Sequence, residues 1–534
     1  MNRHFLFCIL FLFLFFDGFS QPANTNLSNG VLFDGEPYLA VNPTNHQNLV
    51  SAWMGLKFTG GGYHITIKSR ASFDGGNTWS TAKTLPHFSQ SYGSADVSMA
   101  FTKTGLLYLS YIDYRQSPDS GGIYVARSFD GGMNWDAPSK AFDGYDVAIK
   151  RPIDRPWLVA DNSATANSGT LYITTKPAPW IAPPNRNYFK VSSDSGRTWS
   201  PIANIDGGTH LVGSSIAAPM AAPTVTLNGK FCAVYPSYVS SQNPLPAFYL
   251  ASSKNKGQTF SYTTVFAAIP AANDTNLKNG YQLIADPIDS NKLIFFTPDA
   301  KNGDDDIMAF HSNDGGQTWS NEIRVNDDVV ANGKAQDMVW GAYNELGNLV
   351  VTWRDRRNSS TNGFWNAGYD FYYAVSNDNG QTFSANQKLS SQFISFDTLT
   401  SKNGNDFMSC SYCGDTLYSV WGDTRTGKMN IFFAKTIASS NTNVETILLD
   451  GEETQLQFFP NPFSTQTIIH STMNLENATL TIYNSSGQRI KQLKNISGTT
   501  CTLNRDDLPS GNYFLILTKN NRTMATGKLM VTNK

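Results

Sequence analysis

The sequence predicts an all-β protein, most of it a β-propeller of seven blades, with a small second β-domain at the C-terminal end. Three observations predict this fold. A motif of eight residues recurs six times at a nearly constant spacing, the segments between the copies alternate apolar and polar residues, and no long stretch has the helical period of about 3.6 residues. Six blades with an irregular extra sheet are the alternative.

The first twenty residues have the features of a secretory signal peptide. Arg3 and His4 give a positive start, Phe5 to Phe16 is an apolar run, and Gly18-Phe19-Ser20 places small residues at the positions that a signal peptidase reads. We expect cleavage after Ser20. No later stretch approaches about 18 uninterrupted apolar residues, so we expect no transmembrane segment.

The charge balance excludes one class of partner. The chain has 40 Lys and Arg against 42 Asp and Glu, which leaves a net charge of −2. A protein that binds the phosphates of a nucleic acid carries a basic excess. We therefore expect no nucleic-acid partner.

The cysteines give no metal or redox site. Four remain after signal-peptide cleavage, too few for a disulfide-built scaffold. Cys410-Ser-Tyr-Cys413 supplies only two candidate ligands, and a separation of three residues in a strand puts the two side chains on opposite faces. We expect no bound cofactor here.

The repeated motif has the form Ser-x-Asp-x-Gly-x-Thr-Trp. Its glycines, at positions 76, 132, 196, 257, 316 and 380, are separated by 56, 64, 61, 59 and 64 residues. The Ser and Asp side chains can accept hydrogen bonds from turn N–H groups, the Gly permits a left-handed backbone, and the Trp buries a large apolar surface. The acidic position is filled by Asp74, Asp130, Asp194, Asn255, Asp314 and Asp378.

This motif resembles the Asp-box, or BNR repeat, of sialidase-like propellers, and the resemblance covers roughly residues 31–437. It implies that the boxes are structural and lie away from the catalytic face. Each unit between boxes reads as two inner strands, a third strand that ends in the box, and a fourth after it, which is one propeller blade. We assign residues 21–437 to the propeller.

A seventh blade is predicted at the end of the propeller. Residues 406–436 repeat the first three strands without a box, and Asp406-Phe-Met begins like Asp337-Met-Val. We expect its outer strand to come from the N-terminal segment around Thr25 to Leu32, because pairing both ends of the chain removes exposed strand edges.

The C-terminal residues form a separate unit. A polar linker occupies residues 438–454, and Phe459-Pro-Asn-Pro-Phe463 then opens a segment that continues to the end of the chain. Residues 455–534 resemble the type A sorting domain of the type IX secretion system. The resemblance implies an immunoglobulin-like β-sandwich, recognition by the secretion machinery, secretion or cell-surface attachment, cleavage during export, and a Bacteroidota-type source. An ordinary appended binding domain is the alternative.

The sialidase active site does not map onto this sequence. Sialidases of this fold hold the substrate carboxylate with three arginines, the first in an Arg-Ile-Pro motif before the first box. Here Gly35-Glu36-Pro37 places an acid in that neighbourhood, and Arg151-Pro-Ile153 comes one blade later in a different order. A charged Glu36 would repel a carboxylate, so we expect no appreciable hydrolysis of sialosides and a neutral, cationic or metal-bridged ligand.

A set of acids is the first candidate site. Each acid stands near the start of a blade's predicted innermost strand, where the central channel lies. Paired carboxylates there could perform acid–base chemistry on a glycosidic bond or hold a Ca²⁺ ion, and the alternative is that each acid only caps its own blade. The candidates are Glu36, Asp96, Asp154, Asp337 and Asp406.

A non-repeating segment is the second candidate. Arg151, Arg155 and Trp157 do not recur from blade to blade, and non-repeating polar residues on a repeat scaffold are where function more often lies. Trp157, Trp180 and Trp340 are candidates for stacking on sugar rings. Two functions remain open, an exported propeller that binds an extracellular glycan or glycoprotein, and a glycoside hydrolase, including a divergent exo-sialidase.

Overall fold

The computed structural model describes fourteen stretches of the chain, separated by gaps. They are residues 22–59, 62–115, 120–146, 148–213, 220–239, 241–242, 245–267, 280–362, 367–395, 405–438, 456–484, 489–506, 508–519 and 522–532. The predicted signal peptide and all but the first residue of the predicted linker lie outside them. The chain divides into two compact units, Met1–Ser440 and Asn441–Lys534.

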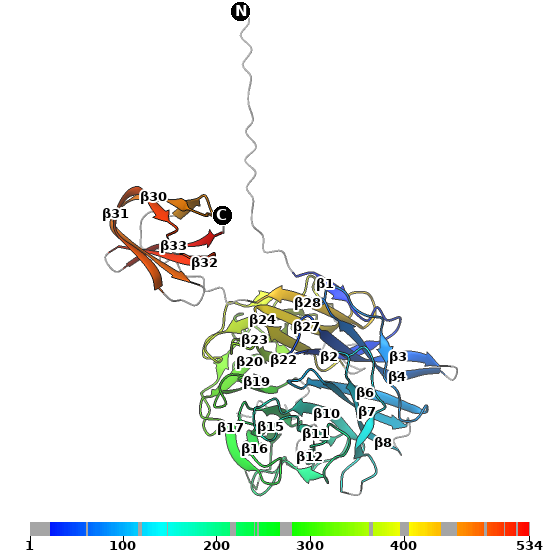
Figure 1. The fold of residues 1–534 in the computed structure, drawn as a ribbon. Helices are drawn as coiled ribbons and strands as arrows, with labels where there is room; N and C mark the ends of the chain where they lie inside the picture. The colour runs from blue at the N-terminus through cyan, green and yellow to red at the C-terminus, as the bar shows by residue number, and fades with distance from the viewer. Residues whose placement is uncertain are drawn as a thin grey trace, which may run out of the picture. The chain divides into compact units, whose positions relative to one another are not determined.

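The larger unit is a ring of seven four-stranded antiparallel sheets within the described residues, and the sheets follow one another around a common centre (Figure 1). Blades 1 to 3 are β2 (Asp34–Val41), β3 (Leu49–Thr59), β4 (Gly62–Ser72), β5 (Lys83–Thr84); β6 (Tyr92–Phe101), β7 (Leu107–Arg115), β8 (Gly121–Ser128), β9 (Ser139–Asp143); and β10 (Ile153–Ala160), β11 (Leu171–Pro177), β12 (Tyr188–Ser192), β13 (Ala203–Asn204). Blades 4 to 6 are β14 (Ala222–Val225), β15 (Phe231–Ser237), β16 (Ala247–Ser253), β17 (Ser261–Ala267); β18 (Gln282–Ala285), β19 (Leu293–Asp299), β20 (Asp306–Ser312), β21 (Ile323–Arg324); and β22 (Gln336–Tyr343), β23 (Leu349–Asp355), β24 (Asp370–Ser376), β25 (Gln387–Lys388). As predicted, the third strand of each of these blades ends at the serine of its box.

Blade 7 closes the ring with strands from both ends of the propeller. Its three inner strands are β26 (Ser409–Cys413), β27 (Thr416–Asp423) and β28 (Asn430–Ile437). The outer strand is β1 (Asn24–Asn26), which lies beside β28 in Figure 1 and pairs Asn24 with Ala434. The predicted seven-bladed ring is confirmed. The N-terminal strand is shorter than the predicted Thr25–Leu32 segment, because it leaves β28 after the Leu27 N–H donates to the Ile431 carbonyl at 2.7 Å.

The interior of the ring is made of apolar side chains between blades, and buried tryptophans recur at one place in the second strand. Trp353 and Trp421 are fully buried, and each donates its ring N–H to the acid two residues later, Asp355 or Asp423, at 2.9 Å. Arg357 donates to Asp355 at 2.9 Å. These hydrogen bonds connect a buried tryptophan ring to an Asp–Arg ion pair of the same blade and stabilise that blade.

Each Asp-box is a small hydrogen-bonded turn. In blade 5 the Gly316 N–H donates to Ser312 Oγ at 2.8 Å, and the Thr318 N–H donates to Asp314 Oδ1 at 2.9 Å. Burial slightly opposes ionisation of Asp314, but the hydrogen bonds from Thr318 and Ser312 outweigh it and lower the pKa of that carboxyl to about 2. Asp314 is only half-buried, so the motif is held by hydrogen bonds more than by burial of the acid.

The glycine of the box joins neighbouring blades. Gly316 has φ of +87°, and a Cβ on it would lie 2.3 Å from Leu250 Cδ2 in blade 4. A Cβ on Gly76 of blade 1 would lie 2.5 Å from the Phe433 ring in blade 7, and one on Gly257 of blade 4 would lie 2.1 Å from Phe189 in blade 3. The box therefore needs Gly for its backbone conformation and for close approach to the preceding blade.

The C-terminal unit is a small β-domain, as predicted. Its strands are β29 (Leu456–Phe459), β30 (Gln466–Asn484), β31 (Arg489–Asn504), β32 (Gly511–Lys519) and β33 (Arg522–Val531), in the order β29-β30-β32-β33 with β31 also paired to β30. The long β30–β31 hairpin changes register several times between His470 and Leu480, and such bulges bend strands. The two ends of the hairpin thus pack on one apolar core that includes Ile469, Ile482 and Leu515.

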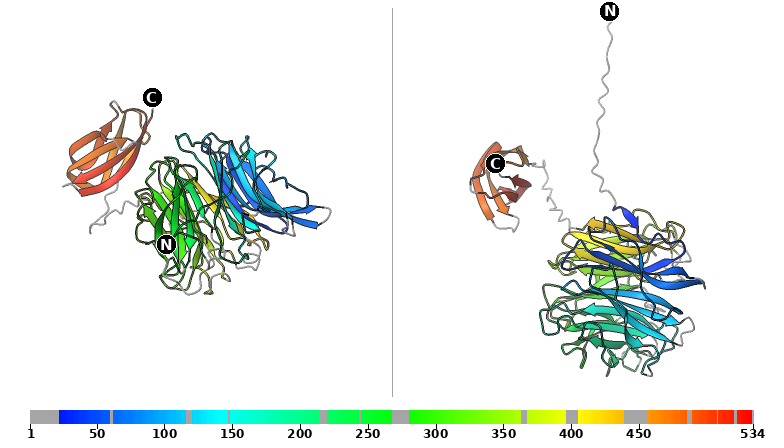
Figure 2. Two further views of the ribbon diagram at one scale, coloured as in Figure 1. Left: turned by 90° about the horizontal axis from the view of Figure 1, so that it is seen from below. Right: turned by 45° about the vertical axis from the view of Figure 1, so that its right-hand side comes forward.

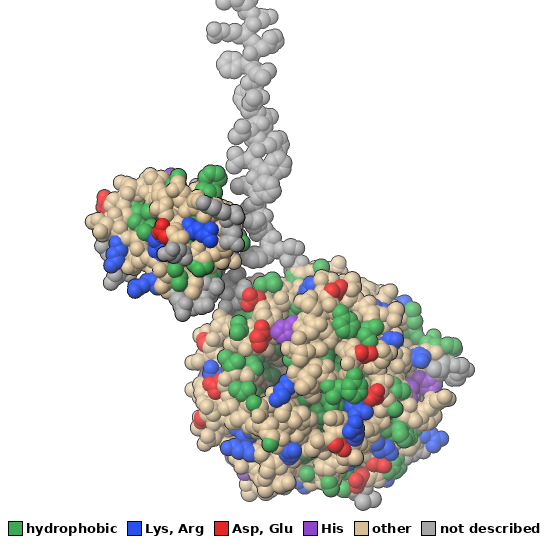
Figure 3. All heavy atoms as spheres, in the orientation of Figure 1, with side chains coloured by type: hydrophobic (Ala, Val, Ile, Leu, Met, Phe, Trp, Pro, Cys, Tyr) green, Lys and Arg blue, Asp and Glu red, His purple; other side chains and the backbone are tan. Residues whose placement is uncertain are grey.

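Figure 2 shows the propeller from two further sides. Over the face drawn in Figure 3, basic, acidic and apolar side chains are interspersed, with no large field of one charge sign. A search of the described residues finds no helix that is both long and apolar enough to cross a membrane.

The box glycine gives a test of the inter-blade contact. We expect Gly316→Ala to lower the free energy of unfolding by about 2–4 kcal/mol, because the new methyl group adds left-handed backbone strain and a clash with Leu250. Gly427→Ala is the matched control, since Gly427 also has a positive φ, +77°, but has open space around its Cβ position. It should cost about 1 kcal/mol. Urea unfolding of the full chain measures both, and equal losses would show that the contact with blade 4 contributes nothing.

Candidate binding site

A shared backbone irregularity places charged residues at the centre of the ring. In the innermost strands β2, β6 and β10 the register shifts between Gly35 and Tyr38, Ala95 and Ser98, and Asp154 and Trp157. Within each of these bulges one residue that is not glycine adopts a left-handed backbone. These residues are Glu36 (φ 52°), Asp96 (φ 53°) and Arg155 (φ 55°). Such bulges re-aim a side chain, and strained residues of this kind gather at functional sites.

The bulge residues meet one another across blades. The buried Arg155 guanidinium pairs with Asp406 of blade 7 and lies 3.9 Å from Glu36 Oε1. The Arg155 N–H donates to Asp96 Oδ2 at 3.4 Å. Together with Asp154 these residues form a buried set that we call the channel cluster: Glu36, Asp96, Asp154, Arg155 and Asp406.

Burial and like charges hold protons in the channel cluster. Burial raises the pKa of Glu36 well above its ordinary value, and the neighbouring Asp406 and Asp96 add to the rise. Burial and the adjacent Asp154 raise the pKa of Asp96 to about 7. Burial alone would lower the pKa of Arg155, but the surrounding carboxylates, Asp406 foremost, raise it. Burial and the neighbouring carboxyls thus favour the protonated form of Glu36, and the expectation that Glu36 repels a carboxylate stays a prediction.

Asp154 differs from the bulge residues because it stands one position earlier in its strand. It lies opposite Lys176 of β11, whose Nζ donates to Asp154 Oδ2 at 2.6 Å. Burial would raise the pKa of Asp154, but Lys176 and a hydrogen bond with Asp96 outweigh it and hold the pKa below its ordinary value. Asp154 is thus the ionised member of a carboxyl pair whose other member, Asp96, keeps a proton up to about pH 7.

Asp337 does not join the channel cluster. It occupies the same register position as Asp154, opposite Arg354 in blade 6. Arg354 Nε donates to Asp337 Oδ1 at 2.7 Å, and Arg356 Nη2 donates to Asp337 Oδ2 at 3.1 Å. The structure therefore brings four of the five candidate acids together. The fifth, Asp337, forms buried ion pairs with Arg354 and Arg356.

Aromatic rings fill the channel beside the channel cluster. Trp340 lies 5.4 Å from Tyr38 and 5.4 Å from Trp157, and Trp157 lies 5.7 Å from Phe407, between ring centroids. The two cavities that border Trp157 measure only about 10 Å³ each, the space of about one water molecule. Arg155 is buried and Trp157 is half-buried beside these small cavities, and their role as ligand contacts stays a prediction.

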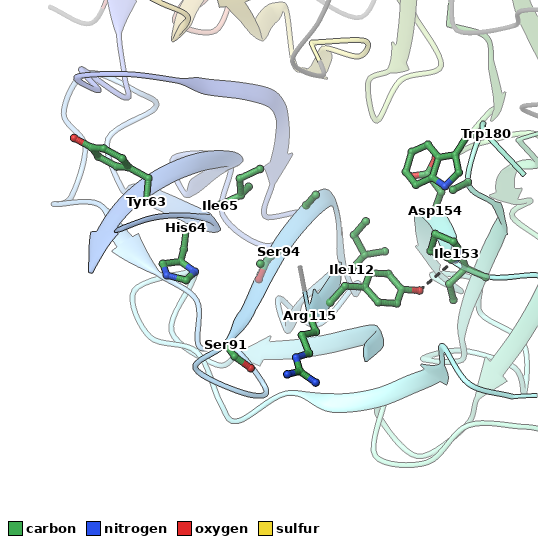
Figure 4. Close-up of a pocket in the computed structure, with 15 residues that line it drawn as sticks. Tyr63, His64, Ile65, Ser91, Ser94, Ile112, Arg115, Ile153, Asp154 and Trp180 are labelled. Atoms are coloured by element: carbon green, nitrogen blue, oxygen red, sulfur yellow. Dashed lines mark hydrogen bonds between the residues drawn. The ribbon is translucent and has the colours of Figure 1, made fainter. Parts of the chain in front are cut away.

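A larger cavity lies to one side of the channel, between blades 1, 2 and 3 (Figure 4). It measures about 360 Å³, within the range of ligand pockets. Asp154 lines it, and Trp180 lies close to Asp154 in Figure 4, with 73% of its surface exposed. We call this cavity the side pocket; it is lined by Tyr63, His64, Ile65, Ser91, Gly93, Ser94, Ala95, Ile112, Tyr114, Arg115, Pro152, Ile153, Asp154, Ala178 and Trp180.

The wall of the side pocket combines apolar and polar groups. The Ile153 N–H donates to the Tyr114 hydroxyl at 3.3 Å, which fixes that ring between blades 2 and 3. His64 and Arg115 lie on the side of the pocket away from Trp180 (Figure 4). Arg151, the third predicted ligand contact, stacks on Tyr145, with its guanidinium carbon 4.4 Å from the ring centroid.

Sequence reasoning found part of this site and missed the rest. Asp154 and Trp180 were candidates, the first as an acid and the second as a stacking ring. Tyr63 and His64 were not among the candidates, and nothing in the sequence set Lys176 apart. The signal that could have marked Trp180 is its setting, since it lies in a proline-rich loop without a counterpart in other blades.

The described residues include no group of three or more His, Cys, Asp or Glu side chains arranged to hold a metal ion. In the channel cluster the positions around the acids are taken by Arg155 and Lys176. A calcium ion bound by these acids therefore stays a hypothesis without a ligand set to support it.

Comparison with protein families agrees with both parts of the sequence interpretation. Residues 122–360 match the BNR repeat-like domain, and residues 457–532 match the secretion system C-terminal sorting domain. The second match confirms the predicted secretion or surface attachment through the type IX system and its machinery as a partner. No curated protein sequence matches the chain significantly.

Several solved structures are similar to the chain at low identity. The Hadza microbial sialidase Hz136 is 15% identical over 70% of this chain and 73% of its own, with a TM-score of 0.41. The GH93 α-L-arabinofuranosidase of Fusarium graminearum in complex with arabinobiose is 13% identical over 78% of this chain and 98% of its own, with a TM-score of 0.44. The leech intramolecular trans-sialidase is 15% identical over 77% of this chain and 70% of its own, with a TM-score of 0.37.

The raised pKa of Asp96 predicts that the free energy of unfolding depends on pH. The pKa of Asp96 is about 7 in the folded protein and about 4 in an unfolded chain, so its stabilising contribution is complete below about pH 4 and is lost as the pH rises through about 7. We expect the urea midpoint to fall between about pH 5 and about pH 8, and to fall less in Asp96→Asn. Glu36 acts in the same direction and leaves a residual slope in the variant.

The exposed Asp415 supplies the control, since Asp415→Asn should leave the pH dependence of the wild type intact. An Asp96→Asn variant with the full wild-type slope would contradict the assignment of a shared proton to the Asp96–Asp154 pair.

Proposed function

We propose that this exported BNR-repeat propeller binds extracellular glycans in the side pocket, between blades 1, 2 and 3. The observation that carries the proposal is the pairing of an ionised carboxylate, Asp154, with a strongly exposed indole, Trp180, in one open cavity. Sugar rings present C–H faces that pack on aromatic rings, and their hydroxyls donate hydrogen bonds to carboxylates. The exposed Trp180 ring contributes little to the packing of the protein core, and its apolar surface is suited to cover by a ligand.

The polar lining supports a hydroxyl-rich ligand. A hydroxyl group both donates and accepts hydrogen bonds, and the pocket offers an acceptor in Asp154 and donors in Arg115 and the Ser91 hydroxyl. Lys176 Nζ pairs with Asp154 and balances its negative charge, so the carboxylate can accept hydrogen bonds from a neutral ligand.

Glycoside hydrolysis is the second candidate, and one observation favours it. Asp96 and Asp154 have pKa values shifted in opposite directions, which is how acid and base roles are divided between carboxyls. Glycosidases, however, place two carboxyls about 5–9.5 Å apart on either side of the bond. Asp96 is hydrogen-bonded to Asp154 and, among the described residues that line the side pocket, only Asp154 carries a carboxylate. Binding without cleavage is therefore the better supported function.

Sialidase activity has less support than either. Arg155, the arginine of the channel cluster, is already paired with Asp406 and lies close to Glu36. Trp157 packs against Trp340 and Phe407 beside this arginine. We keep the expectation of no appreciable sialoside hydrolysis because Arg155 is already paired with carboxyls of the protein.

Glycan-array screening of the full mature chain, followed by calorimetry on the best ligand, tests the proposal. We expect Trp180→Ala to weaken binding by about tenfold or more, because about 1.4 kcal/mol of stacking is lost. Phe129→Ala is the matched control, since Phe129 is equally exposed (68%) but lies in the box turn of blade 2. Absence of any glycan ligand, or equal effects of the two substitutions, would overturn the proposal.

Hydrolysis is measured on the same protein with fluorogenic sialoside and arabinofuranoside substrates. Turnover that disappears in Asp154→Asn, while the variant keeps the wild-type unfolding midpoint, would establish the hydrolase candidate. Sialoside turnover that survives Asp154→Asn but not Arg155→Ala would restore a sialidase site in the channel.

The sorting domain gives a prediction about the exported form. We expect the sorting domain to direct export and to be cleaved off during it. Mass spectrometry of the secreted protein should therefore find no peptides from Leu480 onward. Deletion of residues 457–532 should leave the propeller inside the cell, detected by fractionation and immunoblotting. Abundant C-terminal peptides in the secreted protein would contradict removal of the domain.

A further inference from the structure

We propose that the side pocket binds an internal stretch of a glycan chain, two or more sugar residues long, that runs from Trp180 to the β3–β4 hairpin. The ligand class is therefore an oligo- or polysaccharide chain and not a single terminal sugar. This inference rests on the proposed glycan-binding function and names the part of the glycan that is recognised.

The β3–β4 hairpin projects beyond the rest of its blade. β3 and β4 have 11 residues each, against 9 and 8 in the equivalent strands β7 and β8 of blade 2. The outer strand β5 pairs only with Lys68 and Ser69, so the first half of β4 extends past it. The projecting hairpin is visible at the edge of the ring in Figures 1 and 2.

The projecting part of the hairpin carries exposed aromatic rings. Phe58 and Tyr63 are a cross-strand pair with ring centroids 5.2 Å apart, and 68% and 59% of their surfaces are exposed. Tyr63 also lines the side pocket, whereas Phe58 lies beyond it on the hairpin. Exposed aromatic side chains at the rim of a cavity are typical of binding surfaces.

Tyr63 and Trp180 lie at opposite ends of the side pocket, as Figure 4 shows. They come from different blades, Tyr63 from β4 of blade 1 and Trp180 from the loop after β11 of blade 3. One sugar ring stacks on one aromatic face, so two rings on opposite sides of the cavity stack different sugars of a chain. Both rings are exposed to solvent, and a chain can therefore continue past either end.

The space between the two rings suits the middle of such a chain. Ile65, Ile112 and Ile153 give an apolar surface for the C–H faces of sugars, and Asp154 and Arg115 supply an acceptor and a donor for hydroxyls. A volume of about 360 Å³ exceeds what one sugar ring fills and is small for a folded protein partner.

The small cavities that border Trp157 among the described residues argue against recognition of a terminal sugar beside that ring. A site for a chain end needs a blind cavity that encloses one sugar, and the cavities beside Trp157 hold about one water molecule each. The side pocket instead lies at the edge of the channel and opens between blades.

The experiment compares ligands of increasing length on the full mature chain. The probes are α-1,5-arabino-, β-1,4-xylo- and β-1,4-manno-oligosaccharides from one to about six sugars, together with the parent polysaccharides, with calorimetry and tryptophan fluorescence as readouts. For the series that binds, we expect affinity to rise at least tenfold from the monosaccharide to the longest oligosaccharide. Blocking both ends of that oligosaccharide should leave its affinity unchanged.

Two variants separate the ends of the proposed path. Tyr63→Ala should flatten the rise in affinity with length while the shortest ligand that binds keeps its affinity, because Trp180 and Asp154 still hold that ligand. Trp180→Ala should weaken every length, and Phe129→Ala should change neither. Thermal unfolding checks that each variant is folded.

The outcomes distinguish the two proposals. Equal affinity for short and long ligands, or loss of binding when the chain ends are blocked, overturns the inference of internal recognition and leaves glycan binding intact. Absence of binding to every probe, from monosaccharide to polysaccharide, together with an empty glycan array, overturns the proposed function and the inference with it.

Discussion

Five of the six box glycines approach the preceding blade so closely that a Cβ would lie 2.5 Å or less from a side chain there, and these contacts hold neighbouring blades together. The Ser and Asp of the box satisfy the turn's N–H groups locally, and the missing side chain of the glycine lets that turn press on Leu250, Phe189 or Phe433 of the neighbour. A blade cannot bury both of its faces alone, so this repeated contact sets the angle from blade to blade. The pairing of β1 with β28 then closes the ring without a free edge.

Closure of the ring forces charged side chains together at its centre. The bulges in β2, β6 and β10 turn Glu36, Asp96 and Arg155 inward, where water is excluded. Buried charges must be paired or neutralised. Arg155 is paired with Asp406, and burial with nearby carboxyls raises the pKa of Glu36 and Asp96, which favours their protonated forms. Among the described residues, the cavities that border Trp157 beside this cluster are small.

The side pocket, which we propose as the binding site, lies to one side of the channel. Asp154 belongs to the channel cluster and also lines the side pocket, so it connects the buried charges to the surface. The aromatic rings that the fold leaves exposed, Trp180 and Tyr63, stand on a unique loop and on an overlong hairpin. A repeat scaffold allows the proposed binding groups to stand on its irregular parts, because loops and hairpin tips can vary without disturbing the inter-blade contacts.

The strands, the boxes, the seven-bladed closure and the sorting domain could be predicted from the sequence, because each follows from patterns within a few residues or from their repetition. Which side chains contact one another at the centre of the ring could not be predicted in this way. The sequence aligned Asp154 with Glu36 and Asp96, yet the bulge in β10 puts Arg155 at their equivalent position and Asp154 opposite Lys176. A shift of one residue turns a side chain to the other face of a strand. Period-two alternation does not reveal a bulge, and the pairing of residues more than a hundred positions apart exists only once the ring has closed.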